Sequence, residues 1–292
     1  MRKVTHAQKL FGLLIFLLLS ACATVPQSEE PTNVPPTSTS TSTPTEIPPS
    51  PTATLTPYPI PDGICANILY PLLPGSEWVY QTTNVDGQSR MTFQVIGVQN
   101  DLASIHVVDQ QTGITTDDTA LCAEGAVVNL PMVIMSLMLS DYVDGVINTY
   151  QESGITAPSQ ETFEANKWQY SWEVEKLVEQ PVKVELPGLG SGHILRSNII
   201  KFKSETAGTR ETVTVPAGTF PQAILVSVVM RAPVTIGSSG AVFTASYREW
   251  YEPYVGLLKI QTDSASLDYS GTPLPVPLNK TLELVEYTDG IP

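Results

Sequence analysis

Val213-Thr214-Val215-Pro216-Ala217-Gly218-Thr219-Phe220 lies near the start of residues 210–260, where the strand pattern of this chain is clearest. Thr and Val alternate before the proline, which is typical of a half-buried strand, and Pro-Ala-Gly supplies a tight turn. Ala223–Met230 is apolar throughout, as expected of a central strand covered on both faces. A Gly/Ser turn then leads to Tyr247–Ile260, which contains an aromatic corner at Trp250 and the residue after it. This order predicts a β-meander.

The same two-residue alternation of apolar and polar side chains recurs before and after this stretch. Short turns separate the alternating segments, so we expect an all-β domain with minor α content and mainly antiparallel pairing of roughly ten strands. The inward-facing residues of these segments are Trp78 and Tyr80; Met91, Phe93 and Val95; Ile105 and Val107; Trp168, Tyr170 and Trp172; Val182, Val184 and Leu186; Ile200 and Phe202; Leu282 and Leu284.

One segment, Pro131–Tyr142, breaks the pattern with apolar residues at helical spacing. Proline suits the first turn of a helix, so one short helix is expected here. Three of the six methionines of the chain, Met132, Met135 and Met138, fall in this segment. Methionine adapts its shape to varied apolar partners. The helix is therefore either a lid over an apolar cavity or an ordinary core helix.

The first 21 residues read as the signal peptide of a bacterial lipoprotein. Three basic residues precede the apolar run Leu10–Leu19, which is too short for an ordinary membrane span. The run ends in Leu19-Ser20-Ala21-Cys22, which resembles the lipobox of bacterial lipoproteins. That resemblance implies cleavage before Cys22 and lipidation of Cys22. We expect an exported protein anchored to the outer face of the bacterial cell membrane, or to the outer membrane if the cell has one.

Residues 22–61 form the second predicted part, a disordered stalk that follows the lipidated cysteine. Residues 23–61 contain 11 Pro, 10 Thr and 5 Ser, with no Lys or Arg. Such a composition cannot bury enough apolar surface to fold. Residues 62–292 form the third part, a single β-rich domain with a substantial core.

Charge excludes some partners. The whole chain carries −14, and removal of three basic residues with the signal peptide leaves 12 basic against 29 acidic residues, or −17. A net charge of this sign argues against nucleic acid as a partner. A protein partner is not indicated by any motif, and no cofactor is expected.

Cys65 and Cys122 are the two cysteines that follow Cys22. An even pair in an exported protein predicts a disulfide, which would join the start of the domain to a strand 57 positions later. A zinc site that combines them with His106 and His193 lacks the close ligand pairs typical of zinc, so no metal site is predicted.

The aromatic triad Trp168, Tyr170 and Trp172 has two interpretations: a stacking platform for sugars, or part of the core of a curved sheet. The glycine-rich run before His193 matches neither a nucleophile elbow nor a phosphate loop, and is read as a loop between strands. Asp117 and Asp118 are adjacent, but a sequence does not give the spatial separation that a carboxylate pair needs. Because no residues form a catalytic pattern, we expect a protein that is not an enzyme.

Three motifs look like those of a group of bacterial lipoproteins that is similar to the LolA/LolB-like lipoprotein-carrier fold. They are Tyr70–Tyr80, Val213–Phe220 and Trp250–Lys259. The group usually has Ala-Pro-Gly before Val-Gly-Leu, whereas Glu252-Pro253-Tyr254 stand there in this chain. The resemblance implies a curved antiparallel half-barrel, closed by helices, whose concave side can hold acyl chains. It supplies no catalytic residue.

The expected function is that of a membrane-anchored, non-enzymatic lipoprotein that binds an apolar or lipid-like ligand in the half-barrel. Met132, Met135 and Met138 would form a roof over the ligand, and Trp168, Tyr170 and Trp172 would form a wall. The alternative is an interaction module of the cell envelope that docks a protein or a sugar on an exposed sheet face. A roofed apolar cavity favours the first, and an open aromatic platform favours the second.

Overall fold

The computed structural model describes residues 61–84, 87–186 and 190–290, which fold into fifteen strands and two short helices. The elements up to the second helix are β1 (Glu77–Asn84), β2 (Gly87–Gln99), β3 (Leu102–Asp109), β4 (Thr115–Ala123), β5 (Ala126–Asn129), α1 (Val133–Met138), β6 (Thr149–Gly154) and α2 (Gln160–Ala165). The later elements are β7 (Gln169–Val178), β8 (Val182–Leu186), β9 (Gly190–Ile194), β10 (Ile199–Val215), β11 (Gly218–Ile236), β12 (Ser239–Glu252), β13 (Gly256–Tyr269), β14 (Thr272–Pro275) and β15 (Thr281–Thr288).

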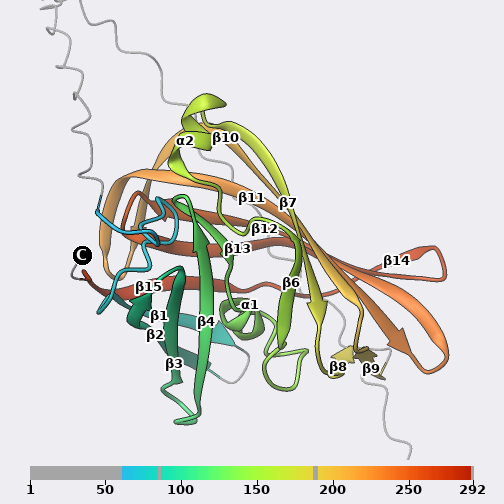
Figure 1. Cartoon of the computed structure of the whole chain (residues 1–292). Coiled ribbons are helices and arrows are strands. Elements are labelled where there is room, and N and C mark those ends of the chain that lie inside the picture. Colours follow the sequence, from blue (N-terminus) through green and yellow to red (C-terminus); the bar gives the residue numbers. More distant parts are fainter. Residues whose placement is uncertain (1–60, 85–86, 187–189, 291–292) are drawn as a thin grey trace, which may run out of the picture. The chain divides into compact units, whose positions relative to one another are not determined.

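All fifteen strands belong to one antiparallel sheet, which curls around the core (Figure 1). The main path runs β5-β4-β3-β2-β1-β15-β13-β12-β11-β10-β7-β6, so two meanders meet at the last strand of the chain. β14 extends β13 as a hairpin, and the β8–β9 hairpin attaches to β11 where His193 faces Thr235. The predicted all-β, mainly antiparallel class is confirmed, although the strands number fifteen rather than ten.

The two ends of the sheet meet and make the barrel nearly closed. Val127 of β5 and Ala157, which follows β6, exchange two backbone hydrogen bonds of 2.9 and 3.0 Å. The sheet therefore curls further than the predicted half-barrel. The twist of an antiparallel sheet brings its two edge strands toward each other. When they pair, their backbone N–H and C=O groups no longer face solvent unpaired.

The meander predicted from residues 210–260 is confirmed, with β10, β11, β12 and β13 paired in sequence. The prediction that Ala223–Met230 is covered on both faces is wrong for part of this strand. Ser227 is exposed and Val229 is 37% exposed, whereas Val226 and Val228 are buried. The outer face of β11 meets solvent there because, among the residues that the structure describes, no second layer covers this part of the barrel. Val229 is thus an apolar residue at an outward position.

The aromatic corner between β12 and β13 is fixed by a close backbone approach. Gly256 has a φ of +107°, and a Cβ added to it would lie 3.1 Å from Nε1 of Trp78. The same indole nitrogen donates a 2.6 Å hydrogen bond to the carbonyl of Val255. Tyr254 has a φ of +60°, in the left-handed region that favours glycine. This chain therefore makes the turn without glycine, the residue that suits this conformation best.

The segment before β1 packs against the barrel and is fixed in two ways. Cys65 and Cys122 form the predicted disulfide, with their Cα atoms 5.3 Å apart. Asn67 is buried, and its amide nitrogen donates to the carbonyls of Gly125 and Pro158 at 2.8 and 2.9 Å. These bonds join three parts of the chain at the seam of the barrel.

The described part of the chain contains two helices, where one was predicted. α1 lies within the predicted segment Pro131–Tyr142 and sits in the interior of the curled sheet (Figure 1). α2 was not predicted, because it has six residues and too few apolar positions to show a helical period. Ser159 caps it by accepting a hydrogen bond from the Thr162 N–H, and its buried Phe163 holds it on the sheet.

The predicted signal peptide, the lipidated Cys22 and most of the predicted stalk lie outside the described residues. Among the residues that are described, neither helix has the length and hydrophobicity that crossing a bilayer requires.

Candidate functional site

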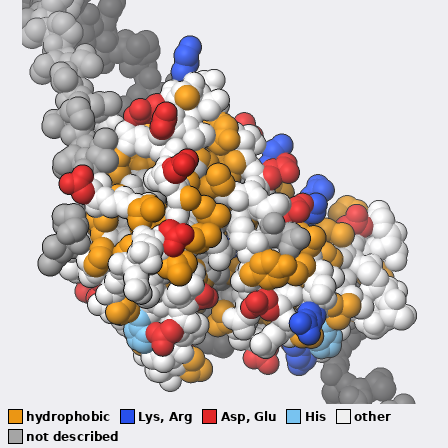
Figure 2. Space-filling view, in the orientation of Figure 1, with side chains coloured by type: hydrophobic (Ala, Val, Ile, Leu, Met, Phe, Trp, Pro, Cys, Tyr) orange, Lys and Arg blue, Asp and Glu red, His pale blue; other side chains and the backbone are white. Residues whose placement is uncertain are grey.

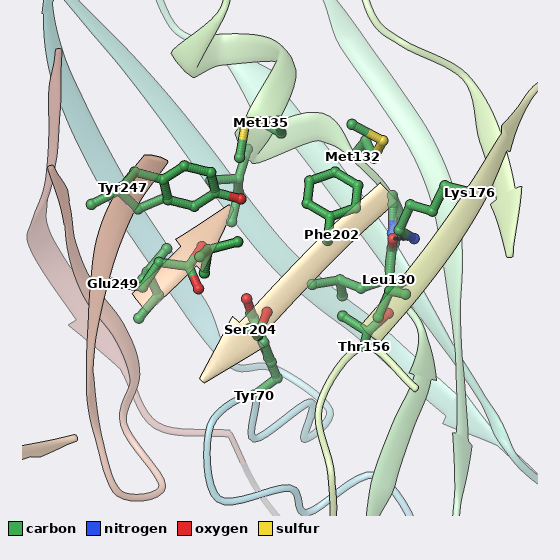
Figure 3. Close-up of a pocket in the computed structure, with 16 residues that line it drawn as sticks. Tyr70, Leu130, Met132, Met135, Thr156, Lys176, Phe202, Ser204, Tyr247 and Glu249 are labelled. Carbon is green, nitrogen blue, oxygen red and sulfur yellow. Dashed lines mark hydrogen bonds between the residues drawn. The ribbon is translucent and has the colours of Figure 1, made fainter. Parts of the chain in front are cut away.

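A partly open cavity of about 100 Å³ lies on the concave side of the sheet, beneath α1 (Figure 3). Strands β7, β10, β11, β12 and β13 form its floor and sides, and the segment leading into α1 forms its roof. The lining residues are Tyr70, Leu130, Pro131, Met132, Ile134, Met135, Thr156, Val174, Lys176, Phe202, Ser204, Val228, Tyr247, Glu249, Leu257 and Ile260. The predicted concave face is therefore roofed rather than open.

The cavity exists because short side chains occupy the middle of one row across the sheet. Strand register places Ser204 beside Val228, and Val228 beside Tyr247. In the next row Phe202 is paired with Met230: Met230 is buried, and the larger Phe202 ring bounds the cavity at that side. Because neither serine nor valine reaches far from the sheet, space remains between the floor and α1.

Two buried lysines anchor the segment that carries the roof, one at each end of α1. Lys176 is 5% exposed, and its ammonium donates to the carbonyl of Leu130 at 2.7 Å and to Oδ1 of Asn129 at 3.0 Å. Lys280 is 2% exposed, and its ammonium lies 3.0 Å from Oγ of Ser140 and 3.1 Å from Oδ2 of Asp141. The roof is thus held to the barrel wall on both sides rather than hinged at one end.

Burial lowers the pKa of both lysines. For Lys176 the loss of hydration brings the pKa to about 8, against a smaller opposing effect of the Asp118 charge. For Lys280 the loss of hydration is again the largest cause, and the hydrogen bond and charge of Asp141 oppose it. A buried ammonium is costly unless it is hydrogen bonded, and both of these are.

A carboxyl group, Glu249, lies at the opposite side of the cavity from Lys176 (Figure 3). Tyr251 donates a 2.7 Å hydrogen bond to one of its oxygens, and the hydroxyls of Tyr251 and Tyr70 lie 2.5 Å apart. Because the Tyr251 proton is directed at the carboxylate, Tyr70 is the donor in the second bond. Burial raises the pKa of Glu249 to about 7, and the Tyr251 hydrogen bond opposes that rise.

Tyr70 lines the cavity and belongs to the segment before β1, which the Cys65–Cys122 disulfide attaches to β4. Its backbone N–H donates a 3.1 Å hydrogen bond to Oδ1 of Asn67, and its ring meets the Tyr251 ring edge-on at 5.2 Å. Burial is the main cause that raises the Tyr70 pKa well above its usual value, so the phenol is neutral. The bond between Cys65 and Cys122 therefore helps to position one wall of the cavity.

The three methionines predicted to form a roof divide between two environments. Met132 and Met135 line the cavity (Figure 3), whereas Met138 is 2% exposed and does not line it. α1 is thus part roof and part core. A ligand-binding role for Met132, Met135 and Met138 stays a prediction.

Trp168, Tyr170 and Trp172, the predicted wall, do not line the cavity. They gather instead around Phe163 of α2, which stacks on Trp168 at 5.2 Å and meets Trp172 edge-on at 5.6 Å. The guanidinium carbon of Arg210 lies 4.3 Å from the Trp168 ring. Trp168 precedes β7 and has a φ of +62°, so it leaves the strand alternation that the sequence suggested. The unexpected helix α2 explains why these rings form a packed cluster.

Sequence reasoning missed two polar groups of the cavity that a stricter use of strand alternation would have found. Lys176 is in phase with the buried Val174 and Val178, and Glu249 is in phase with Tyr247. A charged residue in the inward phase of a strand is a signal for a buried functional group.

Other residues weighed in the sequence do not assemble into a site. Nδ1 of His106 lies 2.6 Å from Oδ1 of Asp117 on the exposed faces of β3 and β4. His193 lies in β9 rather than in a loop. Within residues 61–84, 87–186 and 190–290, no three His, Cys, Asp or Glu side chains group as metal ligands.

Hydrophobic side chains occupy much of the face shown in Figure 2, with single acidic side chains among them. The most exposed large hydrophobic residues of the described chain come from many of its elements and loops: Ile64, Ile96, Leu102, Ile114, Tyr150, Ile155, Leu195, Val229 and Val242. An open aromatic platform, which the docking alternative needs, is not formed by the triad because those rings pack on α2.

Neither a protein-family model nor a curated protein matches this chain. Two solved structures are similar to 76% of it. One is a provisionally described lipoprotein of Parabacteroides distasonis, with 19% identity, 99% of its own chain covered and a TM-score of 0.47. The other is a provisionally described exported protein of Bacteroides fragilis with a YmcC-like fold, with 12% identity, 100% of its own chain covered and a TM-score of 0.44. The resemblance to the LolA/LolB-like carriers stays a prediction.

Proposed function

We propose that this protein is an exported, membrane-tethered lipoprotein that is not an enzyme and that binds a small amphiphilic molecule inside its barrel. The observation that carries the proposal is the cavity between the concave sheet and α1. A barrel with a purely structural role would be filled at this place, because protein interiors are normally packed without voids of this size.

The predicted location supports a binding role outside the cytoplasm. Cys22 would carry the lipid, and residues 22–61 would hold the barrel away from the membrane. The disulfide between Cys65 and Cys122 fits an oxidising compartment, because such bonds are rare in the cytosol.

The lining of the cavity has the mixture typical of ligand sites. Most of its wall is apolar, and a few polar groups such as Glu249, Lys176 and Ser204 point inward (Figure 3). Sites of this composition take amphiphilic ligands, with the apolar wall contributing affinity and the polar groups fixing orientation.

The volume of about 100 Å³ limits what fits. Pockets for drug-sized ligands measure roughly 300–1,000 Å³. We therefore propose that the cavity takes one end of a ligand, and that the rest extends through the open side of the cavity. A whole acyl chain would require displacement of α1, which the two buried lysines oppose.

Aspartate substitutions at two methionines of α1 test this proposal. With Met135→Asp we expect binding of a neutral naphthylamine fluorescent probe to weaken roughly tenfold or more, because a charge would enter the apolar wall. The melting temperature should change by less than about 3 °C, since Met135 is half-buried and faces the cavity.

Met138→Asp is the matched control, because Met138 lies on the same helix but is buried in the core. An unpaired carboxylate there should lower the melting temperature by about 10 °C or more. Absence of probe binding by the unsubstituted protein would remove the basis for a ligand-binding barrel.

A further inference from the structure

The two charged groups that face the cavity, Lys176 and Glu249, differ in how their charge is compensated by neighbouring groups. Lys176 has its ammonium hydrogen bonded by Leu130 and Asn129, which are both acceptors. On the other side, Glu249 accepts a hydrogen bond from Tyr251, which is a neutral donor. Among the ion pairs of the described residues, none involves Glu249.

Glu249 is also directed at the empty space. It keeps part of its surface accessible because that surface faces the cavity, although the group lies deep in the barrel (Figure 3). One carboxyl oxygen accepts from Tyr251, and the other has no hydrogen-bond partner among the described residues. A second donor therefore has room to approach this oxygen from within the cavity.

Electron-rich groups surround the place that such a donor would occupy. The rings of Tyr247, Phe202 and Tyr70 and the thioether of Met135 all line the same space (Figure 3). Aromatic faces attract cations, and the attraction is strongest where water is excluded. A carboxyl group next to several aromatic rings is the combination that recognises an ammonium group.

We propose that the ligand of this cavity carries a cationic ammonium group, which binds against Glu249 and Tyr247 while its apolar part contacts Phe202 and Met135. This inference rests on the proposed binding function and names the chemical class of the ligand. An ammonium group with a few carbons suits a cavity of about 100 Å³, and a longer alkyl chain would leave through the open side.

The titration of Glu249 agrees with this chemistry. Burial raises its pKa to about 7, so without ligand the carboxyl group is partly protonated at neutral pH. A bound cation favours the ionised form, which means that binding should strengthen as the pH rises toward 7 and beyond.

The other groups facing Glu249 do not titrate in the same range. Tyr70, Tyr247 and Tyr251 all have a pKa raised by burial, so they remain neutral. Lys176, across the cavity, has a pKa of about 8 and keeps its charge below neutrality. Its positive charge opposes a cation but changes little between pH 5.5 and about 7.

The test compares three ligands that share one alkyl chain: octylammonium, octanol and octanoate. Isothermal titration calorimetry is carried out on the chain from residue 22 onward, with Cys22→Ala so that no detergent is needed. We expect the ammonium compound to bind at least tenfold more tightly than the other two. Glu249→Gln should remove that preference while leaving the affinity for octanol unchanged.

Glu252→Gln is the matched control, because Glu252 is a buried carboxyl on the same strand that does not line the cavity and whose pKa burial also raises to about 7. It should retain the preference for ammonium. If Glu249→Gln does not fold, the unsubstituted protein still decides the matter: between pH 5.5 and 7 its affinity for the ammonium compound should rise roughly tenfold while that for octanol stays constant.

Equal binding of all three compounds, or a preference for octanoate, would overturn the ammonium proposal and leave the binding function intact. Binding of none of the three would overturn the binding function itself. A preference for ammonium that persists in Glu249→Gln would also overturn the proposal, since another group would then be responsible.

Discussion

Replacing Lys176 by methionine should change how the stability of the protein depends on pH. In the folded protein burial lowers the pKa of Lys176 from 10.5 to about 8. Below pH 8 the lysine is charged in both states, and the folded state carries the cost of a poorly hydrated charge. Between pH 8 and 10.5 the folded protein has released the proton that the unfolded chain still holds, so stability rises with pH across this window.

The magnitude follows from the difference between the two pKa values. Each pKa unit corresponds to about 1.4 kcal/mol, so the difference between 10.5 and about 8 amounts to about 3 kcal/mol over the whole window. Lys176→Met should lack this rise. At pH 7 the free energies of unfolding of Lys176→Met and of the unsubstituted protein should differ less than at pH 10. The variant loses the hydrogen bonds to Leu130 and Asn129, but it also lacks the costly buried charge.

Urea unfolding followed by tryptophan fluorescence, at pH 7, 8, 9 and 10 and constant ionic strength, measures this difference. The quantity of interest is the free energy of unfolding of the unsubstituted protein minus that of Lys176→Met at each pH. Lys203→Met, which removes an exposed lysine from the neighbouring β10, is the control for loss of a positive charge. If the difference stays constant from pH 7 to 10, the reasoning about Lys176 is wrong.

Two further predictions concern the stability of the barrel and the anchoring of the protein to the membrane. Gly256→Ala should lower the free energy of unfolding by about 2 kcal/mol, because its φ is +107° and the new Cβ would press on Trp78. Gly240→Ala has nothing within 4 Å of the added Cβ and should change stability far less, as urea titration would show. Cys22→Ala should release the protein from the membrane fraction without changing its melting temperature. Persistent lipid labelling of that variant would mean that the lipobox was misread.

Local alternation was sufficient to predict the class of the fold. Trp78 and Tyr80, or Val182 and Val184, show their buried face in a window of a few residues, and the structure confirms it. The nearly closed barrel was not predictable in this way, because closure depends on Val127 meeting Ala157, a pairing between segments 30 residues apart with no local signature.

The site was predicted in part for a similar reason. The methionine-rich segment stands out in the sequence, and Met132 and Met135 do reach the cavity. The position of the space itself depends on side-chain sizes across β10, β11 and β12, where Ser204 and Val228 are neighbours through register. Register between strands is a property of the whole sheet, which a reading of single segments does not provide.

Because of where β15 lies in the sheet, the barrel cannot finish folding until the C-terminal strand is available. β15 pairs with β1 on one side and with β13 on the other, so the final strand of the chain joins the two meanders (Figure 1). A chain that crosses a membrane from its N-terminus exposes the free edges of β1 and β13 until Thr281–Thr288 has crossed. Exposed edges are sites of aggregation, and pairings distant in sequence form slowly. Loss of these last strand residues would therefore open the sheet at its middle rather than shorten it at one end.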